Sequence, residues 1–315
     1  TGRFRDRPTL VLDLNSARAG ARTVDLSYMT GGLSWRADYV GSISSDEKRM
    51  NLTGLVTLTN ESGTSYDDAR VQLVAGNVNV AEPRSGTEAG VPSGTTNDVY
   101  SVNAQQENYF EYHLYTLGRR TTIENNQTKQ VTLLAARDVP VRKTLELRGS
   151  ANYYQNANAD LGDKLPVGVY LSFENRNGDL GIPLPGGIVR LYKNDSHGLS
   201  QFLGSDAIEH TPKNETVRLH LGDSFDVTAK KKQTDFHFVG NGSCATQSSY
   251  EVRLGNAKPQ PQDVLVIEPI PAEWKILREN LPHVKSSSST ATWTVRIPAE
   301  SHATLRYTSW VKWCG

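Results

Sequence analysis

The sequence has no long apolar runs, no net charge and few cysteines. Nowhere in its 315 residues do roughly 18 apolar side chains follow one another, so no transmembrane segment is predicted. Lys plus Arg and Asp plus Glu both number 34, and this balance offers no global field for nucleic acid or an anionic membrane. A neutral protein also meets little electrostatic resistance to self-association.

Only two cysteines, Cys244 and Cys314, are present. In an exported chain two cysteines indicate one disulfide, whereas in the cytosol they indicate nothing. We predict a Cys244–Cys314 disulfide, which would close a loop of about 70 residues and stabilise the fold by roughly 4 kcal/mol on the chain-entropy model. Alternatively Cys244, in a glycine-containing loop, is a free and reactive thiol.

Catalytic and cofactor motifs are missing. There is no Gly-x-Ser-x-Gly elbow and no phosphate-binding glycine pattern, and the seven histidines are scattered without zinc-ligand spacing. We therefore expect no enzyme and no cofactor. Calcium is a weak alternative, because Asn175, Asn177 and Asp179 place oxygens at alternate positions of a turn, although plain turns use the same residues.

Alternation of apolar and polar residues is the strongest pattern that is present. Val24 to Val40 alternates on both sides of Gly31-Gly32, which predicts two strands joined by a tight turn, with Trp35 and Tyr39 in the core. A ligand site on the opposite face, at Arg36 and Asp38, is the alternative. Hardly any segment has a helical period, so the predicted fold is all-β.

A strand that ends in Asn, a polar turn and a second apolar strand recur three times, after Asn60, Asn175 and Asn256. This recurrence predicts tandem, antiparallel, immunoglobulin-like β-sandwich modules. We place a larger sandwich region at 1–235 and a small sandwich at 236–315, and we interpret Lys230 to Lys232 as a solvated linker. The polar stretch 81–107 is predicted to be a long insertion loop, ordered only if a neighbour holds it.

Several stretches resemble the bacterial family catalogued as domain of unknown function 4139. They are LSYMTGGLSWRADYV with the following LTGLVTLTNESGTSYDDARVQLVAGNVN, then YFEYHL, KQVTLL and PGGIVRLY, and finally YEVRLGNAKPQPQDVLVIEPIPAEWKIL. The resemblance implies an exported, all-β protein like the C-terminal region of mucoidy-inhibitor-like proteins, with a further region upstream of Thr1. It implies no activity and no catalytic residues.

Two functions fit these observations. The first is a non-enzymatic structural or interaction protein, secreted, periplasmic or on the cell surface, that assembles with itself or an envelope partner through exposed strand edges. The second is a carbohydrate- or peptide-binding module, less readily a hydrolase, that uses exposed aromatics (Trp274, Tyr153 and Tyr154) and the acidic pair Asp67-Asp68. As a core residue, Trp274 would instead pack beneath the strand that Pro269 ends.

Overall fold

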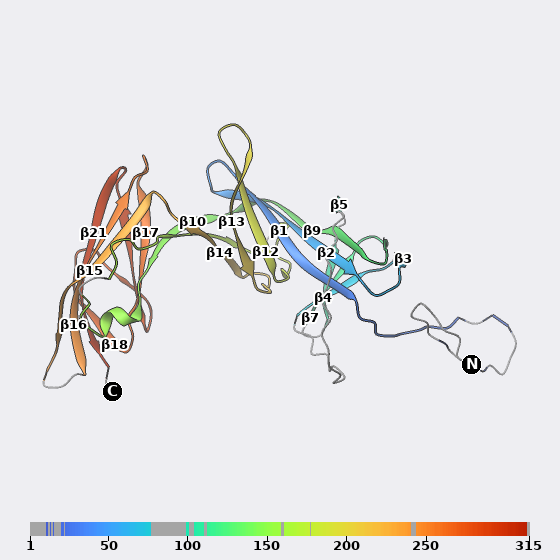
Figure 1. Cartoon of the computed structure of the whole chain (residues 1–315), viewed down its shortest axis with the longest axis horizontal. Coiled ribbons are helices and arrows are strands. Elements are labelled where there is room, and N and C mark those ends of the chain that lie inside the picture. Colours follow the sequence, from blue (N-terminus) through green and yellow to red (C-terminus); the bar gives the residue numbers. More distant parts are fainter. Residues whose placement is uncertain are drawn as a thin grey trace. The chain divides into compact units, whose positions relative to one another are not determined.

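The computed structural model describes residues 11, 13, 15, 20–21, 23–76, 99–100, 104–109, 112–158, 161–176, 178–240 and 244–313, with only the backbone described at 99–100 and 104–109. Apart from one short 3-10 helix, η1 (Ala151–Tyr154), every regular element in these ranges is a β-strand (Figure 1). No helix in the described ranges has the length and apolar character needed to cross a membrane. These strands confirm the all-β prediction. They form where apolar and polar residues alternate, because that alternation lets a strand bury one face.

The strands form two compact units, and the chain passes from one to the other more than once. Unit 1 comprises Thr1–Pro140 and Glu174–Val217, and unit 2 comprises Val141–Phe173 and Arg218–Gly315. This division differs from the boundary predicted after residue 235, because β15 (Val227–Phe238) runs across that point and pairs along its length with β16 (Ala245–Asn256). The predicted linker at Lys230 to Lys232 is therefore wrong.

Unit 1 is sandwich-like, with one large sheet packed against two small ones. The core between them includes Val56, Leu58, Leu73 and Tyr115. The large sheet has the order β13 (Ser200–Ile208), β12 (Gly187–Asn194), β1 (Leu33–Ile43), β2 (Arg49–Asn60), β9 (Gln127–Pro140), β5 (Val99–Tyr100). The small sheets are β4 (Gln72–Ala75), β7 (Tyr112–Leu117), β6 (Ala104–Tyr109), and β3 (Tyr66–Ala69) with β8 (Thr121–Ile123).

Unit 2 is also sandwich-like, and its two sheets share a single core that includes Leu147, Val266, Trp293, Val252 and Leu305. The six-stranded sheet has the order β14 (Thr216–Asp223), β11 (Gly168–Glu174), β10 (Arg142–Arg148), β17 (Gln262–Pro269), β20 (Thr290–Ile297), β19 (Val284–Ser287). The four-stranded sheet has the order β15, β16, β21 (Ser301–Lys312), β18 (Glu273–Glu279).

Among the strand pairs whose register the structure describes, most are antiparallel, as predicted, and three are parallel. These are β1 with β12, β10 with β17, and β5 with β9. The members of each pair are far apart in the sequence, so no short hairpin turn sets their relative direction. At the β1–β12 pair the backbones approach closely, because a Cβ on Gly187 would overlap the Ala37 carbonyl.

The three recurring asparagines hold equivalent positions in the structure. Asn60, Asn175 and Asn256 are 0%, 0% and 3% exposed. Each side-chain amide donates to backbone carbonyls beyond its own strand, and each side-chain oxygen accepts from a backbone N–H in the turn that follows. The repeated pattern in the sequence thus corresponds to a buried asparagine at a strand end whose side chain is hydrogen-bonded to the backbone on two sides. We call this arrangement the amide clip.

The first half of the predicted N-terminal hairpin is not a strand. β1 begins at Leu33, whereas residues 23–30, called the arm below, belong to no strand and are exposed throughout. Val24, Leu26, Tyr28 and Met29 expose 52%, 50%, 60% and 87% of their surface. The alternation of the arm is real, but within the described chain no neighbouring strand covers its apolar side.

The predicted insertion loop at 81–107 is strand in part. The backbone of 99–100 forms β5 beside β9, and 104–109 forms β6, which pairs with β7. Backbone pairing needs no apolar side chains, so a polar composition did not exclude strands here. The remainder of 81–107 lies outside the described residues.

Candidate functional site

The cysteine prediction is only half covered by the described residues. Cys244 is exposed at the start of β16, and its carbonyl accepts a hydrogen bond of 2.7 Å from the backbone N–H of Trp313. Cys314 lies outside the described residues, one position beyond Trp313. The pairing of β16 with β21 thus places Trp313 next to Cys244. The disulfide stays a prediction.

The turn considered for calcium is built around Asn175. Its side-chain oxygen accepts from the N–H of Gly181 at 3.1 Å, and Asp179 Oδ2 accepts from the N–H of Arg137 at 3.3 Å. Asn177 lies outside the described residues. Among the residues that are described, no three or more His, Cys, Asp or Glu side chains gather as metal ligands would. Calcium binding at this turn stays a prediction.

On the Arg36/Asp38 face, Asp38 forms ion pairs with two arginines. Asp38 is 7% exposed and accepts from Arg36 Nε at 3.1 Å and from Arg190 Nη1 at 2.8 Å. Both carboxylate oxygens therefore have cationic partners within the protein. The arrangement joins β1 to β12 across the outer face of the large sheet.

The aromatic residues proposed for carbohydrate binding do not form an exposed platform. Trp274 is 6% exposed and Tyr154 is 0% exposed, and only Tyr153 is partly accessible. Trp274 donates from Nε1 to the Ser288 carbonyl at 2.7 Å, as suits a core residue. Asp67 and Asp68 are exposed in β3, and Asp68 forms an ion pair with Arg120 at 3.6 Å. The prediction of exposed aromatics is wrong for Trp274 and Tyr154, because both complete the core of unit 2.

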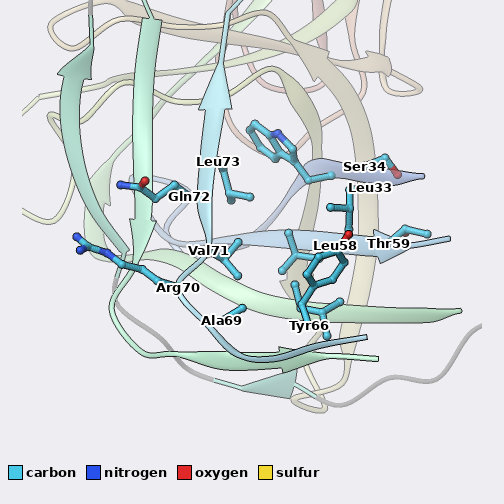
Figure 2. Close-up of a pocket in the computed structure, with 12 residues that line it drawn as sticks. Leu33, Ser34, Leu58, Thr59, Tyr66, Ala69, Arg70, Val71, Gln72 and Leu73 are labelled. Carbon is cyan, nitrogen blue, oxygen red and sulfur yellow. The ribbon is translucent and has the colours of Figure 1, made fainter. Parts of the chain in front are cut away.

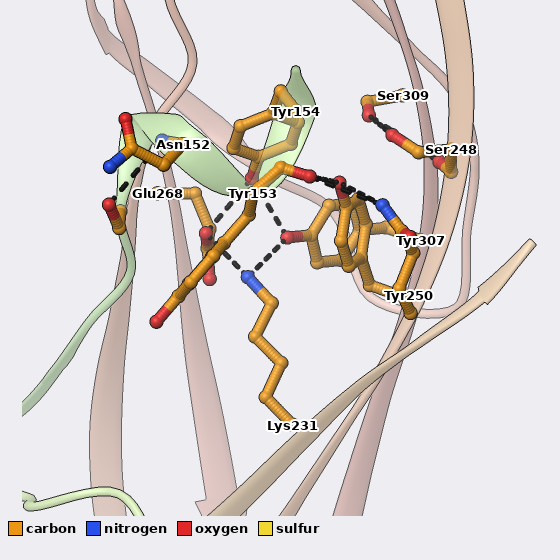
Figure 3. A network of polar contacts seen from close by, with 11 residues as sticks. Asn152, Tyr153, Tyr154, Lys231, Ser248, Tyr250, Glu268, Tyr307 and Ser309 are labelled. Atoms are coloured by element: carbon orange, nitrogen blue, oxygen red, sulfur yellow. Dashed lines mark hydrogen bonds and ion pairs between the residues drawn. The ribbon is translucent and has the colours of Figure 1, made fainter. Parts of the chain in front are cut away.

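Four ionisable side chains meet in the core of unit 2, and we call them the Lys231 cluster: Lys231, Glu268, Tyr154 and Tyr307. Lys231 Nζ lies 2.7 Å from Glu268 Oε2, and the two side chains are 1% and 0% exposed. Lys231 also donates to Tyr307 at 3.1 Å, and Tyr154 donates to Glu268 at 2.9 Å. Because the Tyr154 proton is committed to Glu268, Tyr307 donates to Tyr154 at 2.9 Å, which closes a ring of four hydrogen bonds (Figure 3).

Aromatic faces surround the ammonium group of the Lys231 cluster. Lys231 Nζ lies 4.5 Å from the ring centre of Tyr153 and 4.7 Å from that of Tyr250. At these distances the ring quadrupoles attract the cation. Gly149 makes room for the carboxylate, because a Cβ there would overlap Glu268 Oε2. Glu268 Oε1 is buried and accepts no hydrogen bond from the described residues, so the carboxylate is held through one oxygen.

Burial shifts the titration of the Lys231 cluster. Desolvation lowers the pKa of Lys231, and the charge and hydrogen bond of Glu268 oppose that shift. Desolvation, reinforced by the charge of Glu268, raises the pKa values of Tyr154 and Tyr307 well above 10.0. Lysine, glutamate and tyrosine could transfer protons in an open site. Here they are sealed in the core and bound to one another, so the geometry serves structure.

Sequence reasoning missed Lys231 because it sits in a run of three lysines. One signal could have found it, since Val227, Ala229 and Lys231 continue one period-two pattern and all three are buried. Lys230 and Lys232 lie on the opposite, exposed face. The partner Glu268 follows Val264 and Val266 on the buried face of β17 in the same way.

An open site lies in unit 1, at one end of the sandwich, and is called the Trp35 pocket. It has a volume of about 280 Å³. Leu58, Val71 and Leu73 point into it, whereas Arg70 extends outward at its edge (Figure 2). The complete lining is Leu33, Ser34, Trp35, Leu58, Thr59, Tyr66, Ala69, Arg70, Val71, Gln72, Leu73 and Ile123.

Tyr66 gives the Trp35 pocket its polar feature. Its hydroxyl is buried and has no hydrogen-bond partner among the described residues. A buried hydroxyl without a partner loses the hydrogen bonds that water would supply, and such groups are rare in folded proteins. The pocket therefore combines apolar walls with one unsatisfied polar group, which is typical of ligand sites.

The comparisons with known proteins gave one match. A family model described as domain of unknown function (DUF4139) matches residues 24–314, nearly the whole chain. No curated protein matches the chain, and no solved structure does. The matched range includes the Trp35 pocket, the Lys231 cluster and all but the first residue of the arm.

Proposed function

This chain belongs to the DUF4139 family, and from that premise we propose that it is a non-enzymatic protein that assembles with other protein chains. The observation that carries the proposal is the arm. Four apolar side chains, Val24, Leu26, Tyr28 and Met29, stand at least half exposed within six residues. Exposed apolar surface of this density is typical of protein–protein contacts.

The pattern of the arm favours strand addition as the mode of contact. In an extended chain Val24, Leu26 and Tyr28 lie on one face, at a repeat of about 7 Å. The backbone N–H and C=O groups of such a segment are free to pair with a strand of another chain. The large sheet of unit 1 ends at β13, where Phe202 and Leu199 are also exposed. Assembly with a second copy or with an envelope partner would bury these groups.

The Lys231 cluster supports the non-enzymatic part of the proposal. Its lysine and glutamate are side chains that could transfer protons, yet each is at most 1% exposed. A secreted, periplasmic or cell-surface location belongs to the same proposal. It is supported by the position of Cys244 beside Trp313, since a disulfide to the adjacent Cys314 would persist only in an oxidising compartment.

The oligomeric state tests the proposal. We expect the full chain to associate as its concentration rises, measured by size-exclusion chromatography with light scattering. The double substitution Leu26→Ser with Tyr28→Ser should abolish association without changing the melting temperature of the single chain, because these side chains are half or more exposed among the residues that the structure describes. Leu199→Ser with Phe202→Ser is the comparison variant for the sheet edge, because it removes similarly exposed apolar groups from β13 and from the turn before it.

Two results would contradict the proposal. One is a wild-type chain that is monomeric at every concentration and captures no partner from the envelope. The other is association that neither the arm variant nor the β13 variant weakens. If only the β13 variant loses association, assembly is real but uses the sheet edge rather than the arm.

A further inference from the structure

We infer that the Trp35 pocket binds the arm of a second copy of this chain. This inference rests on the proposed function, and it specifies the partner and the binding site. The pocket and the arm are both in unit 1, and both are incomplete as they stand. Within the described residues, no side chain fills the apolar space of the pocket, and no neighbouring segment covers the apolar side chains of the arm. Each supplies what the other needs.

The size of the pocket fits side chains better than a cofactor. At about 280 Å³ it lies just below the range of roughly 300–1,000 Å³ that is typical of small-molecule sites. Such a space accommodates one large side chain or two smaller ones. Tyr28 would enter such a space, and Leu26, two positions away on the same face of an extended arm, would contact its rim.

The Tyr66 hydroxyl indicates that the occupant carries hydrogen-bonding groups. It is buried at the pocket wall without a partner among the described residues, so a purely apolar ligand would leave it unsatisfied. An extended polypeptide presents a carbonyl oxygen at every residue. Because this hydroxyl is closed to water in the unoccupied pocket, a small shift of the wall would bring it to a backbone carbonyl of the arm, which would accept its hydrogen bond while a neighbouring side chain fills the apolar space.

The exit of the arm from β1 explains why the occupant comes from another copy. Gly32 has a φ of +79°, and a Cβ there would lie 2.6 Å from the Glu61 carbonyl oxygen. The Gly32 carbonyl also accepts from the Glu61 N–H at 2.6 Å. The chain is thus fixed where it leaves β1, directly beside Leu33 and Ser34 of the pocket wall. From this point the arm runs exposed at every residue from 23 to 30, so it does not occupy the pocket of its own chain in this structure.

An arm that enters the pocket of the next copy makes a head-to-tail contact. The two surfaces are different, so each copy offers one donor and one acceptor, and association continues into a ring or an open chain. This property allows a test with two complementary defects. The arm variant (Leu26→Ser with Tyr28→Ser) retains an intact pocket. A pocket variant, Ala69→Trp, fills the acceptor and retains an intact arm.

We expect each variant to be monomeric alone and an equimolar mixture to form dimers that grow no further. Light scattering measures the mass, and the melting temperature verifies that Ala69→Trp is folded. Tyr66→Phe is the second acceptor variant, because it removes one hydroxyl and preserves the pocket shape. It should weaken association roughly 2- to 10-fold, the usual effect of one lost hydrogen bond.

The outcomes separate this inference from the proposed function. If the arm variant is monomeric while the folded Ala69→Trp and Tyr66→Phe variants both assemble like the wild type, the proposed function stands and the pocket is not the acceptor. If the wild type is monomeric and its arm is protected from proteolysis until Ala69→Trp is introduced, the arm occupies its own pocket and the inference is overturned. A wild type that is monomeric with an unprotected arm overturns both.

Discussion

At the scale of single residues, the Lys231–Glu268 pair is the most unusual feature of the molecule. Both side chains are removed from water, and each depends on the other for its charge partner. Removing two charges from water costs several kcal/mol for each ion, and attraction between them recovers that cost only with good geometry and further hydrogen bonds. Tyr154 and Tyr307 supply those bonds. The pair is therefore expected to specify the packing of unit 2 more than to add stability.

This account predicts the result of a double-mutant cycle. Lys231→Met should destabilise unit 2 by roughly 3–5 kcal/mol, because it leaves the Glu268 carboxylate buried and unpaired. Glu268→Leu should cost a similar amount. The double variant should cost far less than the sum, because no charge remains and Tyr154 still bonds Tyr307. Urea unfolding measures the three free energies, and additive single effects would contradict the account.

At the scale of elements, alternation of apolar and polar residues predicted strands correctly where another part of the chain covers the apolar face. β1 was predicted from Leu33 to Tyr39 because its apolar positions alternate, and Tyr39 is fully buried as expected. The arm alternates equally well but has no covering sheet, and no local pattern distinguishes the two cases. The Trp35 pocket could not be predicted, because Trp35 and Tyr66 meet only once β3 pairs with β8. That pairing joins segments more than 50 residues apart.

The recurring asparagines are the element-scale feature that the sequence did indicate. The repeats identified Asn60, Asn175 and Asn256 as strand ends, but turn chemistry alone gave no reason for them to be buried. In the structure each amide satisfies backbone groups of two segments at once, for example Gln260 and Pro298 for Asn256. Buried backbone carbonyls need such partners. The amide is therefore required for its two-sided hydrogen bonding and not for its turn propensity.

Replacing these asparagines by aspartate tests the clip. Asn175→Asp and Asn256→Asp keep the shape but exchange an amide donor for a carboxylate oxygen that faces backbone carbonyls. Each should destabilise its unit by about 3 kcal/mol or more, because a charged group is left buried and repelled. Asn194→Asp, at an exposed position at the end of β12, is the matched control and should change stability by less than about 0.5 kcal/mol. Thermal or urea unfolding measures the difference, and equal effects at all three sites would refute a clip.

At the scale of the whole molecule, buried tyrosine hydroxyls make the fold sensitive to alkali. Burial raises the pKa of Tyr250 to about 12, and it raises the pKa values of five others from 10.0. The full set is Tyr39, Tyr115, Tyr153, Tyr154, Tyr250 and Tyr307. Two are in unit 1 and four are in unit 2. In each unit the neutral hydroxyl is the form that the fold accommodates.

The direction of the pH effect follows from these shifts. A folded-state pKa above 10.0 means that the folded chain retains a proton that the unfolded chain releases, so this stability is complete below pH 10 and is lost as the pH rises further. Lys231 has the opposite effect on stability. Because its pKa is lowered in the folded chain, the unfolded chain binds this proton more tightly, and the contribution of Lys231 to stability therefore rises with pH up to about 10.5. One lysine opposes four tyrosines in unit 2, so the net effect above pH 10 is destabilising.

We therefore expect a cooperative alkaline transition in which tyrosinate absorbance appears together with the loss of β-sheet circular dichroism. Ionisation and unfolding should coincide, because the buried hydroxyls cannot ionise in place without losing partners such as the Tyr153 carbonyl, which accepts from Tyr250 at 2.6 Å. Tyr250→Phe removes one of the ionising groups and should move the transition of unit 2 to higher pH, measured relative to the stability of the same variant at neutral pH. The control is Tyr28→Phe, at a residue that is 60% exposed in the single chain, and it should leave the transition unmoved when measured at concentrations too low for association. Tyrosinate that appears gradually from pH 10 in a chain that keeps its circular dichroism would show that the hydroxyls titrate without unfolding, and would remove the basis for this prediction.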